Sequence, residues 1–269
     1  MSLTAYSDSA SASDRANPAG PPVATVLLHM PSKRGSKRTA KPRTGHREVL
    51  RADKFLSETS AQLRPRVRPL FRKEGSEVFQ IRIHGRGGQG VVTAAEMLAL
   101  AGFMEGHKAQ AFPSFGSERT GAPVVAFARL SPTEIRLREP VLEPDVVLIQ
   151  DRTLLESVPV FAGLRPDGFV LVNSSQTPEA LGLGDLKRQL PAGHVMCVPA
   201  TKFALAALGR PLPGAGMLAG FAAMTAMMQL KSVEDAYAVK FAGRIAEANA
   251  EIARQAYEYV VAQKEKNHA

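Results

Sequence analysis

Apolar and polar residues follow a regular order from residue 77 onward, whereas the first 45 residues show almost no periodic pattern. Residues 78–83 mostly alternate apolar and polar side chains, which is typical of a β-strand with one face in a core. Residues 91–101 are predominantly apolar and predict a helix. Between them lies the segment HGRGGQG at 84–90, so the local order is strand, glycine loop, helix.

The remaining apolar runs predict an α/β domain. Further strands are predicted at 108–112, 124–130, 135–138, 146–149, 169–173 and 194–198. Of these, 124–130 and 135–138 are expected to pair as a hairpin. Helices are predicted at 199–208, 214–230 and 242–264. The last helix is expected to bury one face, formed by Ile245, Ala248, Ile252 and Tyr259. The predicted fold is a Rossmann-like, mostly parallel sheet flanked by helices, with a β-hairpin insertion and a helical C-terminus.

The net charge of +9 belongs entirely to the N-terminal segment. Residues 1–76 contain 15 Lys and Arg against 6 Asp and Glu, whereas residues 77–269 contain 19 of each kind. Residues 1–45 are rich in Ser, Ala, Pro, Gly and basic side chains and predict a disordered basic tail. Residues 46–76 predict a strap with a short helix and an extended basic stretch. Residues 77–269 are predicted to be the folded domain.

Several interpretations of the tail fit its composition: a solvated segment, an arm that contacts nucleic acid or an acidic partner, a transit peptide, or an over-extended start. Asp8 and Asp14 disfavour the transit peptide, since such peptides are poor in acidic residues. No apolar run reaches the roughly 18–20 residues that a membrane span requires. The single cysteine, Cys197, excludes an intrachain disulfide and a multi-cysteine metal site. We therefore predict no metal ligands, no membrane partner and a cytoplasmic location.

The glycine loop predicts a site for an anion. Glycines permit a tight turn, and the start of the following helix offers unpaired N–H groups and a positive dipole end. A dinucleotide site also needs an acidic side chain at the end of the next strand. Residues 112–114 provide no carboxylate there, and Glu105 lies at the far end of the helix. Two alternatives remain: the loop holds a phosphate of another cofactor, or it contacts a partner chain.

A second loop, at 113–123, is expected beside the glycine loop at the carboxyl edge of the sheet, where α/β folds bind ligands. Its Phe115 suggests burial by a ligand or another chain, although folding back onto its own domain is an equal alternative. The candidate binding residues are Gly85, Arg86, Gly87, Gly88, Gln89, Gly90, Ser114, Phe115, Gly116, Glu118 and Arg119. No catalytic arrangement stands out, so the catalytic residues stay unassigned and part of a shared site is expected.

These motifs, taken in order, closely resemble the gamma subunit of pyruvate:ferredoxin oxidoreductase and related 2-oxoacid oxidoreductases. The resemblance covers about residues 79–260 and is carried by residues 83–90 with 92–95, by 111–124, by 144–147 with 150–156, by 198–201 and by 247–251.

The resemblance implies a multi-subunit enzyme that oxidatively decarboxylates a 2-oxoacid with coenzyme A to an acyl-CoA and CO2. It implies thiamine diphosphate and [4Fe-4S] clusters on partner subunits of alpha, beta and delta type, and ferredoxin or another electron-transfer protein as acceptor. This chain is expected to bind no cofactor alone, to contact coenzyme A or a partner chain, and to lay the strap at 46–76 on partner subunits. Nucleic acid is not an expected partner. The alternative is a stand-alone nucleotide-binding or regulatory module with a nucleic-acid-binding tail.

Overall fold

The computed structural model describes residues 26–27, 78–114 and 120–268. The predicted strap at 46–76 and nearly all of the predicted tail lie outside the described residues. Within the range of the predicted tail the structure describes β1 (Val26–Leu27), which pairs antiparallel with β3 (Lys108–Pro113). A sheet edge offers unpaired N–H and C=O groups, so a short apolar segment can add to it.

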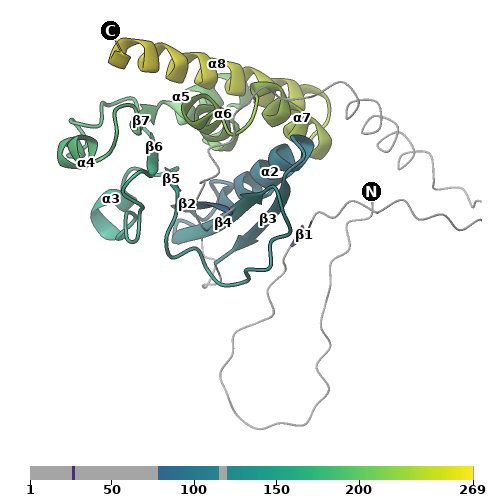
Figure 1. Cartoon of the computed structure of the whole chain (residues 1–269). Helices are drawn as coiled ribbons and strands as arrows, with labels where there is room; N and C mark the ends of the chain where they lie inside the picture. The colour runs from purple at the N-terminus through teal and green to yellow at the C-terminus, as the bar shows by residue number, and fades with distance from the viewer. Residues whose placement is uncertain (1–25, 28–77, 115–119, 269) are drawn as a thin grey trace, which may run out of the picture.

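A seven-stranded mixed sheet forms the centre of the domain, in the order β1-β3-β4-β2-β5-β6-β7 (Figure 1). The strands not yet given are β2 (Phe79–Arg86), β4 (Pro123–Ser131), β5 (Val146–Ile149), β6 (Phe169–Asn173) and β7 (Val195–Val198). Strands β2, β5, β6 and β7 pair in parallel, whereas β2-β4 and β4-β3 pair antiparallel. The predicted Rossmann-like α/β fold is confirmed, with parallel pairing confined to one half of the sheet.

Helices cover both faces of the parallel half. The helices are α2 (Val91–Met104), α3 (Leu154–Ser157), α4 (Gly184–Gln189), α5 (Ala200–Leu208), α6 (Gly214–Thr225), α7 (Leu230–Lys240) and α8 (Gly243–His268). Side chains alternate along a strand, so Leu148 and Leu171 pack on the face of α2 and α6, whereas Val147 and Val170 pack towards α3 and α4. The larger core lies under α2, α5, α6, α7 and α8 (Figure 1).

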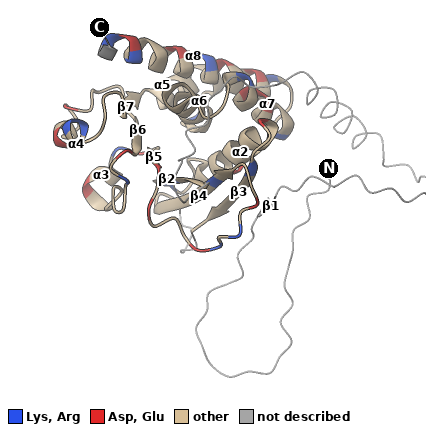
Figure 2. Cartoon of the chain, viewed as in Figure 1, with Lys and Arg blue, Asp and Glu red and all other residues tan. Residues whose placement is uncertain are grey.

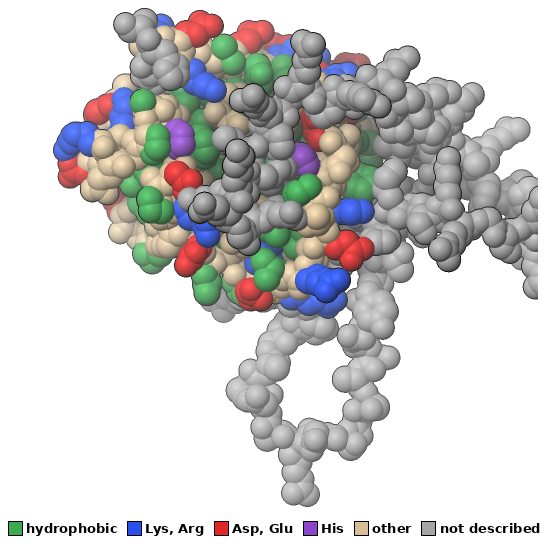
Figure 3. Space-filling model, viewed as in Figure 1, with side chains coloured by type: hydrophobic (Ala, Val, Ile, Leu, Met, Phe, Trp, Pro, Cys, Tyr) green, Lys and Arg blue, Asp and Glu red, His purple; other side chains and the backbone are tan. Residues whose placement is uncertain are grey.

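Helix α6 lies at the centre of the larger core, and every one of its residues is buried. It carries no charged side chain, whereas α4, α7 and α8 carry many (Figure 2). Small residues allow the close approach: a Cβ on Gly216 would lie 2.8 Å from the Cβ of Ala200. On the face drawn in Figure 3, acidic and basic side chains are interspersed, which agrees with the balanced charge of residues 77–269.

The prediction that residues 124–130 and 135–138 pair as a hairpin is wrong for its second strand. Strand β4 pairs with β3 on one side and β2 on the other, and residues 135–138 form no strand. The reason is a buried arginine, because the guanidinium of Arg129 donates to the carbonyl oxygens of Leu137 at 3.3 Å and Glu139 at 2.5 Å. These carbonyl groups bind a side chain rather than a neighbouring strand.

The helix predicted at 214–230 stops short of residue 230. Helix α6 ends at Thr225, whose hydroxyl donates to the carbonyl of Phe221, and Ala226 adopts a left-handed conformation with φ of 53°. Lys264 of α8 donates to the carbonyl oxygens of the last turn of α6. Helix α7, which the prediction missed, begins where the carboxylate of Glu105 accepts bonds from Gln229 and Ser232. Glu105 thus anchors the start of α7 to the end of α2.

Helix α8 is confirmed, but its predicted buried face is wrong in part. Its buried side is formed by Asn249, Ile252, Ala253, Ala256 and Val260. Ile245 is 52% exposed and Tyr259 is 38% exposed. Ile245 lies one turn before Asn249, the first buried residue of the helix. Tyr259 precedes the buried Val260, and its ring contacts the ring of Phe203 edge-on.

Candidate functional site

The glycine loop lies between β2 and α2 at the carboxyl edge of the parallel strands. Gly90 has φ of 72° and ψ of 32°, a left-handed conformation that favours glycine, and it turns the chain directly into α2. The turn closes through a hydrogen bond from Gln89 N to Arg86 O at 3.1 Å. Gly87 N donates to Ala122 O at 2.9 Å, which ties the loop to the segment before β4.

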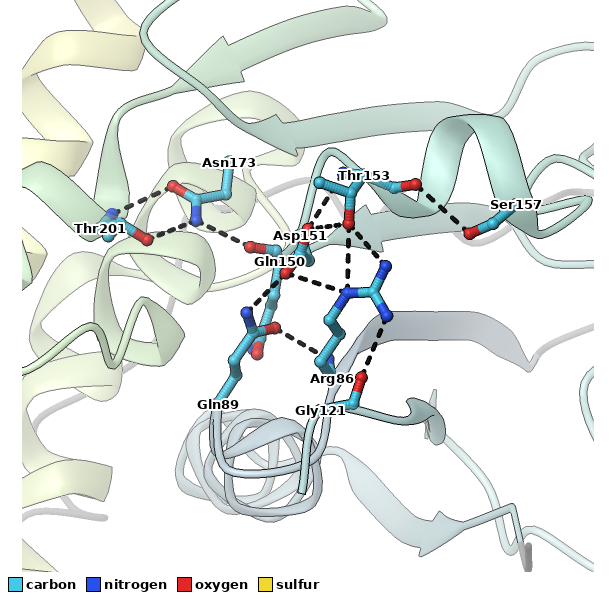
Figure 4. A network of polar contacts seen from close by, with 9 residues as sticks. All are labelled: Arg86, Gln89, Gly121, Gln150, Asp151, Thr153, Ser157, Asn173 and Thr201. Atoms are coloured by element: carbon cyan, nitrogen blue, oxygen red, sulfur yellow. Dashed lines mark hydrogen bonds and ion pairs between the residues drawn. The ribbon is translucent and has the colours of Figure 1, made fainter. Parts of the chain in front are cut away.

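Side chains hold the glycine loop rigid from within (Figure 4). Gln89 accepts a bond from Arg86 N at 2.8 Å through Oε1 and donates to Asp151 at 2.8 Å through Nε2. The Arg86 guanidinium donates to Thr153 and to the carbonyl of Gly121, and its Nε lies 3.4 Å from Asp151. The loop is therefore preorganised, and the Arg86 and Gln89 side chains are engaged within the protein.

Asp151 is the centre of this network. Burial raises the pKa of its carboxyl group, but hydrogen bonds from Thr153 and Gln89 and the charge of Arg86 outweigh that effect and hold the pKa below its ordinary value. Asp151 therefore remains an anion at neutral pH, and its charge orients the loop.

Replacing this anion should loosen the loop. In Asp151→Asn the side chain keeps its shape but loses the ion pair with Arg86 and part of its accepting capacity. We expect the free energy of unfolding to decrease by about 1–2 kcal/mol, measured by urea titration, because hydrogen bonds to a charged group are stronger than neutral ones and this group is only partly exposed. The matched control is Asp185→Asn, which breaks an exposed ion pair with Arg188 and should cost under about 0.5 kcal/mol. Equal losses would contradict the role of Asp151.

The start of α2 opens into a pocket of about 440 Å³, called here the loop pocket. Its walls include Gly87, Gly88 and Gly90 and the first turn of the helix, up to Thr93. The first intrahelical hydrogen bond runs from Ala94 N to Gly90 O at 2.9 Å, so the N–H groups of the preceding turn have no partner within the helix. Such groups, together with the helix dipole, favour an anion.

A second pocket of about 650 Å³ lies along the carboxyl ends of β5, β6 and β7 and is called here the edge pocket. Asn173 organises one wall: its Oδ1 accepts from Thr201 N at 3.0 Å, and its Nδ2 donates to Thr201 Oγ1 at 2.6 Å and to Gln150 O at 2.8 Å. These bonds fix the start of α5 against two strand ends (Figure 4). Gln89 and Asp151 lie at its boundary with the glycine loop.

His84, beside the loop, and Cys197, on β7, are both uncharged at neutral pH. Burial, followed by the charge of Arg82, lowers the pKa of His84 to about 4, so its imidazole is neutral. Burial raises the pKa of the Cys197 thiol to about 12, which leaves it protonated. Within residues 78–114 and 120–268, no three metal-ligating side chains gather, and no helix is long and apolar enough to cross a membrane.

The structure brings part of the predicted site together. Gly85 and Arg86 end β2, and Gly87, Gly88, Gln89 and Gly90 complete one loop around the start of α2. Ser114 lies exposed after β3, and its N–H donates to Val125 O. The other predicted residues of the second loop, namely Phe115, Gly116, Glu118 and Arg119, lie outside the described residues.

Sequence reasoning missed Gln150, Asp151, Thr153, Asn173 and Thr201. An acidic side chain after residue 112 would adjoin the loop only if β3 were the parallel neighbour of β2, but β3 pairs within the antiparallel half. That neighbour is β5, which is followed by Gln150 and Asp151. Polar residues directly after wholly apolar strands were the signal that could have found this edge.

The fold and the site define a class: an α/β domain with a rigid glycine loop at a parallel sheet edge and no self-sufficient reaction centre among the described residues. A family model, "Pyruvate ferredoxin/flavodoxin oxidoreductase", matches residues 80–259. The chain therefore belongs to that family.

Relatives and solved structures agree with this assignment. The chain is 46% identical to "Pyruvate/ketoisovalerate oxidoreductases common subunit gamma" of Pyrococcus abyssi, over 67% of this chain and 96% of the relative. It is 48% identical to "Pyruvate synthase subunit PorC" of Methanosarcina barkeri, over 58% of this chain and 83% of the relative. The crystal structure of pyruvate oxidoreductase subunit PORC from Thermotoga maritima has a TM-score of 0.58 at 35% identity, covering 68% of this chain and 97% of that one.

The predicted function class is thus confirmed: the chain is a subunit of a 2-oxoacid oxidoreductase. The alternative, a stand-alone nucleotide-binding or regulatory module, gains no support from these comparisons.

Proposed function

We propose that this chain is the gamma-type component of a cytoplasmic complex that oxidatively decarboxylates a 2-oxoacid, with pyruvate as substrate. The complex releases CO2, transfers the acyl group to coenzyme A and passes the electrons to a separate acceptor. Thiamine diphosphate and [4Fe-4S] clusters belong to partner subunits of alpha, beta and delta type, and ferredoxin takes the electrons. The names of the relatives support pyruvate and the gamma-type role. The single buried cysteine supports the placement of clusters elsewhere.

The contribution of this chain is to hold coenzyme A at the loop pocket. The observation that carries this proposal is a pocket of about 440 Å³ lined by the glycine loop and by the first turn of a 14-residue helix, whose N–H groups have no partner within the helix. Because Arg86 and Gln89 are engaged within the protein, the main chain rather than these side chains would bind a phosphate group. The predicted contacts from residues 114–119 would complete the site.

A negative charge placed in the loop pocket tests this proposal. In Thr93→Asp the new carboxylate lies in the first turn of α2, where it is compatible with the helix dipole but occupies the place of an anion. We expect the KM for coenzyme A, measured on the assembled complex, to rise at least about tenfold through charge repulsion, with an unchanged KM for pyruvate. Thr93→Asn is the neutral control and should retain the original KM.

A structural role for the loop is the second candidate, since the loop and the segment before β4 are bonded together at a molecular edge. In that case Thr93→Asp would release the chain from its partners and leave both KM values of the remaining complex unchanged. A rise in the KM for pyruvate alone would contradict both roles.

A further inference from the structure

The outer edge of β3 is a place where the sheet can receive a further strand. Directly after β3, Ser114 N donates to Val125 O at 2.8 Å, which fixes the direction of the main-chain groups along the strand. These groups alternate, so every second residue counted back from Ser114 faces β4. The residues between them, Ala109 and Ala111, direct their N–H and C=O groups away from β4. This outward row is what another strand would bind.

Two residues protect the ends of this edge but not its middle. Lys108 carries a charge at one end, and Pro113 has no N–H to offer at the other. Ala109 and Ala111, between them, provide no such protection. Among the described residues after 77, no strand pairs with this side of β3. The middle of the edge therefore needs another kind of cover.

The opposite edge of the sheet is covered by a helix. There the side chain of Gln263, on α8, donates to the main-chain oxygen of Cys197 in β7 at 2.8 Å. No helix can cover β3 in the same way without leaving its outward N–H groups for another acceptor, since a strand edge is matched best by another strand.

Strand β1 takes this position at the edge of β3 (Figure 1). Val26 lies opposite Ala111 and Leu27 opposite Gln110 in an antiparallel pair. Because Ala111 directs its main-chain groups outward, Val26 is the residue whose main chain pairs with it. The family model matches the chain only from residue 80, so the added strand comes from outside the family domain.

The sequence around β1 is suited to a short added strand. Residues 23–28 read VATVLL, which is the most apolar stretch of the first 45 residues. Pro21 and Pro22 precede it and Pro31 follows it, and prolines do not continue a ladder. Residues 28–77 tether this segment to the domain, which gives it an effective concentration on the order of 0.1–1 mM at the edge. Pairing within one chain is therefore favoured over pairing with a second copy at micromolar protein.

We propose that the outer edge of β3 is a strand-addition site, that residues 26–27 occupy it within the same chain, and that this keeps two copies of the chain from pairing through their β3 edges. Two identical edges can pair antiparallel about a two-fold axis and join two sheets into one. The inference concerns the edge alone, and it does not depend on the ligand of the loop pocket or on the 2-oxoacid.

Hydrogen exchange tests whether β1 occupies the edge. In Val26→Pro the residue loses its N–H and cannot complete the pair with Ala111. In the full chain at about 1 µM, we expect the amide of Ala111 to exchange at least about tenfold faster than in the native chain. The amides of Gln110 and Phe112, which face β4, should be unchanged. Ala40→Pro is the matched control, the same change elsewhere in the N-terminal segment, and should leave Ala111 protected.

Sedimentation velocity tests the consequence. Between about 1 and 100 µM the native chain and Ala40→Pro should remain monomeric, whereas Val26→Pro should dimerise as its concentration increases. In that dimer Ala111 should be protected again, because the edge of the second copy takes the place of β1. Deletion of residues 2–30 removes β1 altogether and should act like Val26→Pro, which keeps the test valid if the proline variant does not fold.

Unchanged exchange at Ala111 in both variants overturns the proposal, since β1 would then not cover the edge. Variants in which Ala111 exchanges faster but which stay monomeric at every concentration overturn the role against self-pairing. A native chain that is dimeric, and that loses protection at Ala111 when the dimer is diluted, would show that a second copy provides the strand.

Discussion

Arg129→Met should lower the free energy of unfolding by about 3–5 kcal/mol, the largest loss expected from a single substitution in this domain. Arg129 is fully buried, and its guanidinium binds Gln80, Gln110 and two main-chain carbonyl groups of the segment after β4. It also lies 5.1 Å from the centre of the Phe112 ring. Methionine fills part of the volume but leaves these acceptors buried and unpaired.

The measurement is urea unfolding followed by circular dichroism, with hydrogen exchange at residues 132–141. We expect exchange to increase most in that segment, because its carbonyl groups lose their partner. Arg136→Met, at an exposed position in the same segment, is the control and should change stability by less than about 0.5 kcal/mol. A similar small effect for Arg129→Met would show that the arginine does not hold this segment.

The domain should lose stability as the pH falls from about 6.5 to 4, and His84 should account for about 3 kcal/mol of the loss. His84 is 5% exposed, and its Nε2 has no hydrogen-bond partner among the residues that the structure describes. Burial and the charge of Arg82 lower its pKa to about 4, compared with an ordinary value of 6.5. Between pH 6.5 and 4 the unfolded chain binds a proton at His84 that the folded chain does not, so the free energy of unfolding decreases as the pH decreases. Above pH 6.5 the imidazole is neutral in both states and makes no such contribution.

Comparison of the native chain with His84→Gln isolates this contribution. Urea midpoints measured at several pH values between 4 and 7.5 should show a smaller decrease for the variant than for the native chain. If both lose stability in parallel, another group is responsible. The result also bears on function, because a neutral His84 at physiological pH is not a proton donor for the reaction.

The glycine loop and the strands around it were predictable because their signals are local. The alternating strand, the loop and the helix start all occupy their predicted places. What the alternation could not reveal is that both faces of β2 are buried. Arg82 is 8% exposed, because it donates to the carbonyl groups of Val141, Val160 and Ala162 in irregular segments that cover this face. Those segments are distant in sequence and carry no periodic pattern.

The parts of the candidate site that escaped prediction depend on strand order. Asp151 lies beside the loop only because β5, rather than the next strand in sequence, is the parallel neighbour of β2. The break after α6 is another case: it depends on Lys264 and Glu105, which reach it from α8 and from the end of α2. Ala226 itself gives no local signal for a left-handed turn.

The most direct test of the central claim is reconstitution of the complex with and without this chain. Partner subunits purified alone should be brown from their iron–sulfur clusters, and adding the chain should restore coenzyme A-dependent reduction of ferredoxin by pyruvate. The native chain should remain bound in a fixed ratio to its partners. Full activity of the partner subunits without the chain, or isolation of the chain as a colourless monomer that never joins them, would contradict the account.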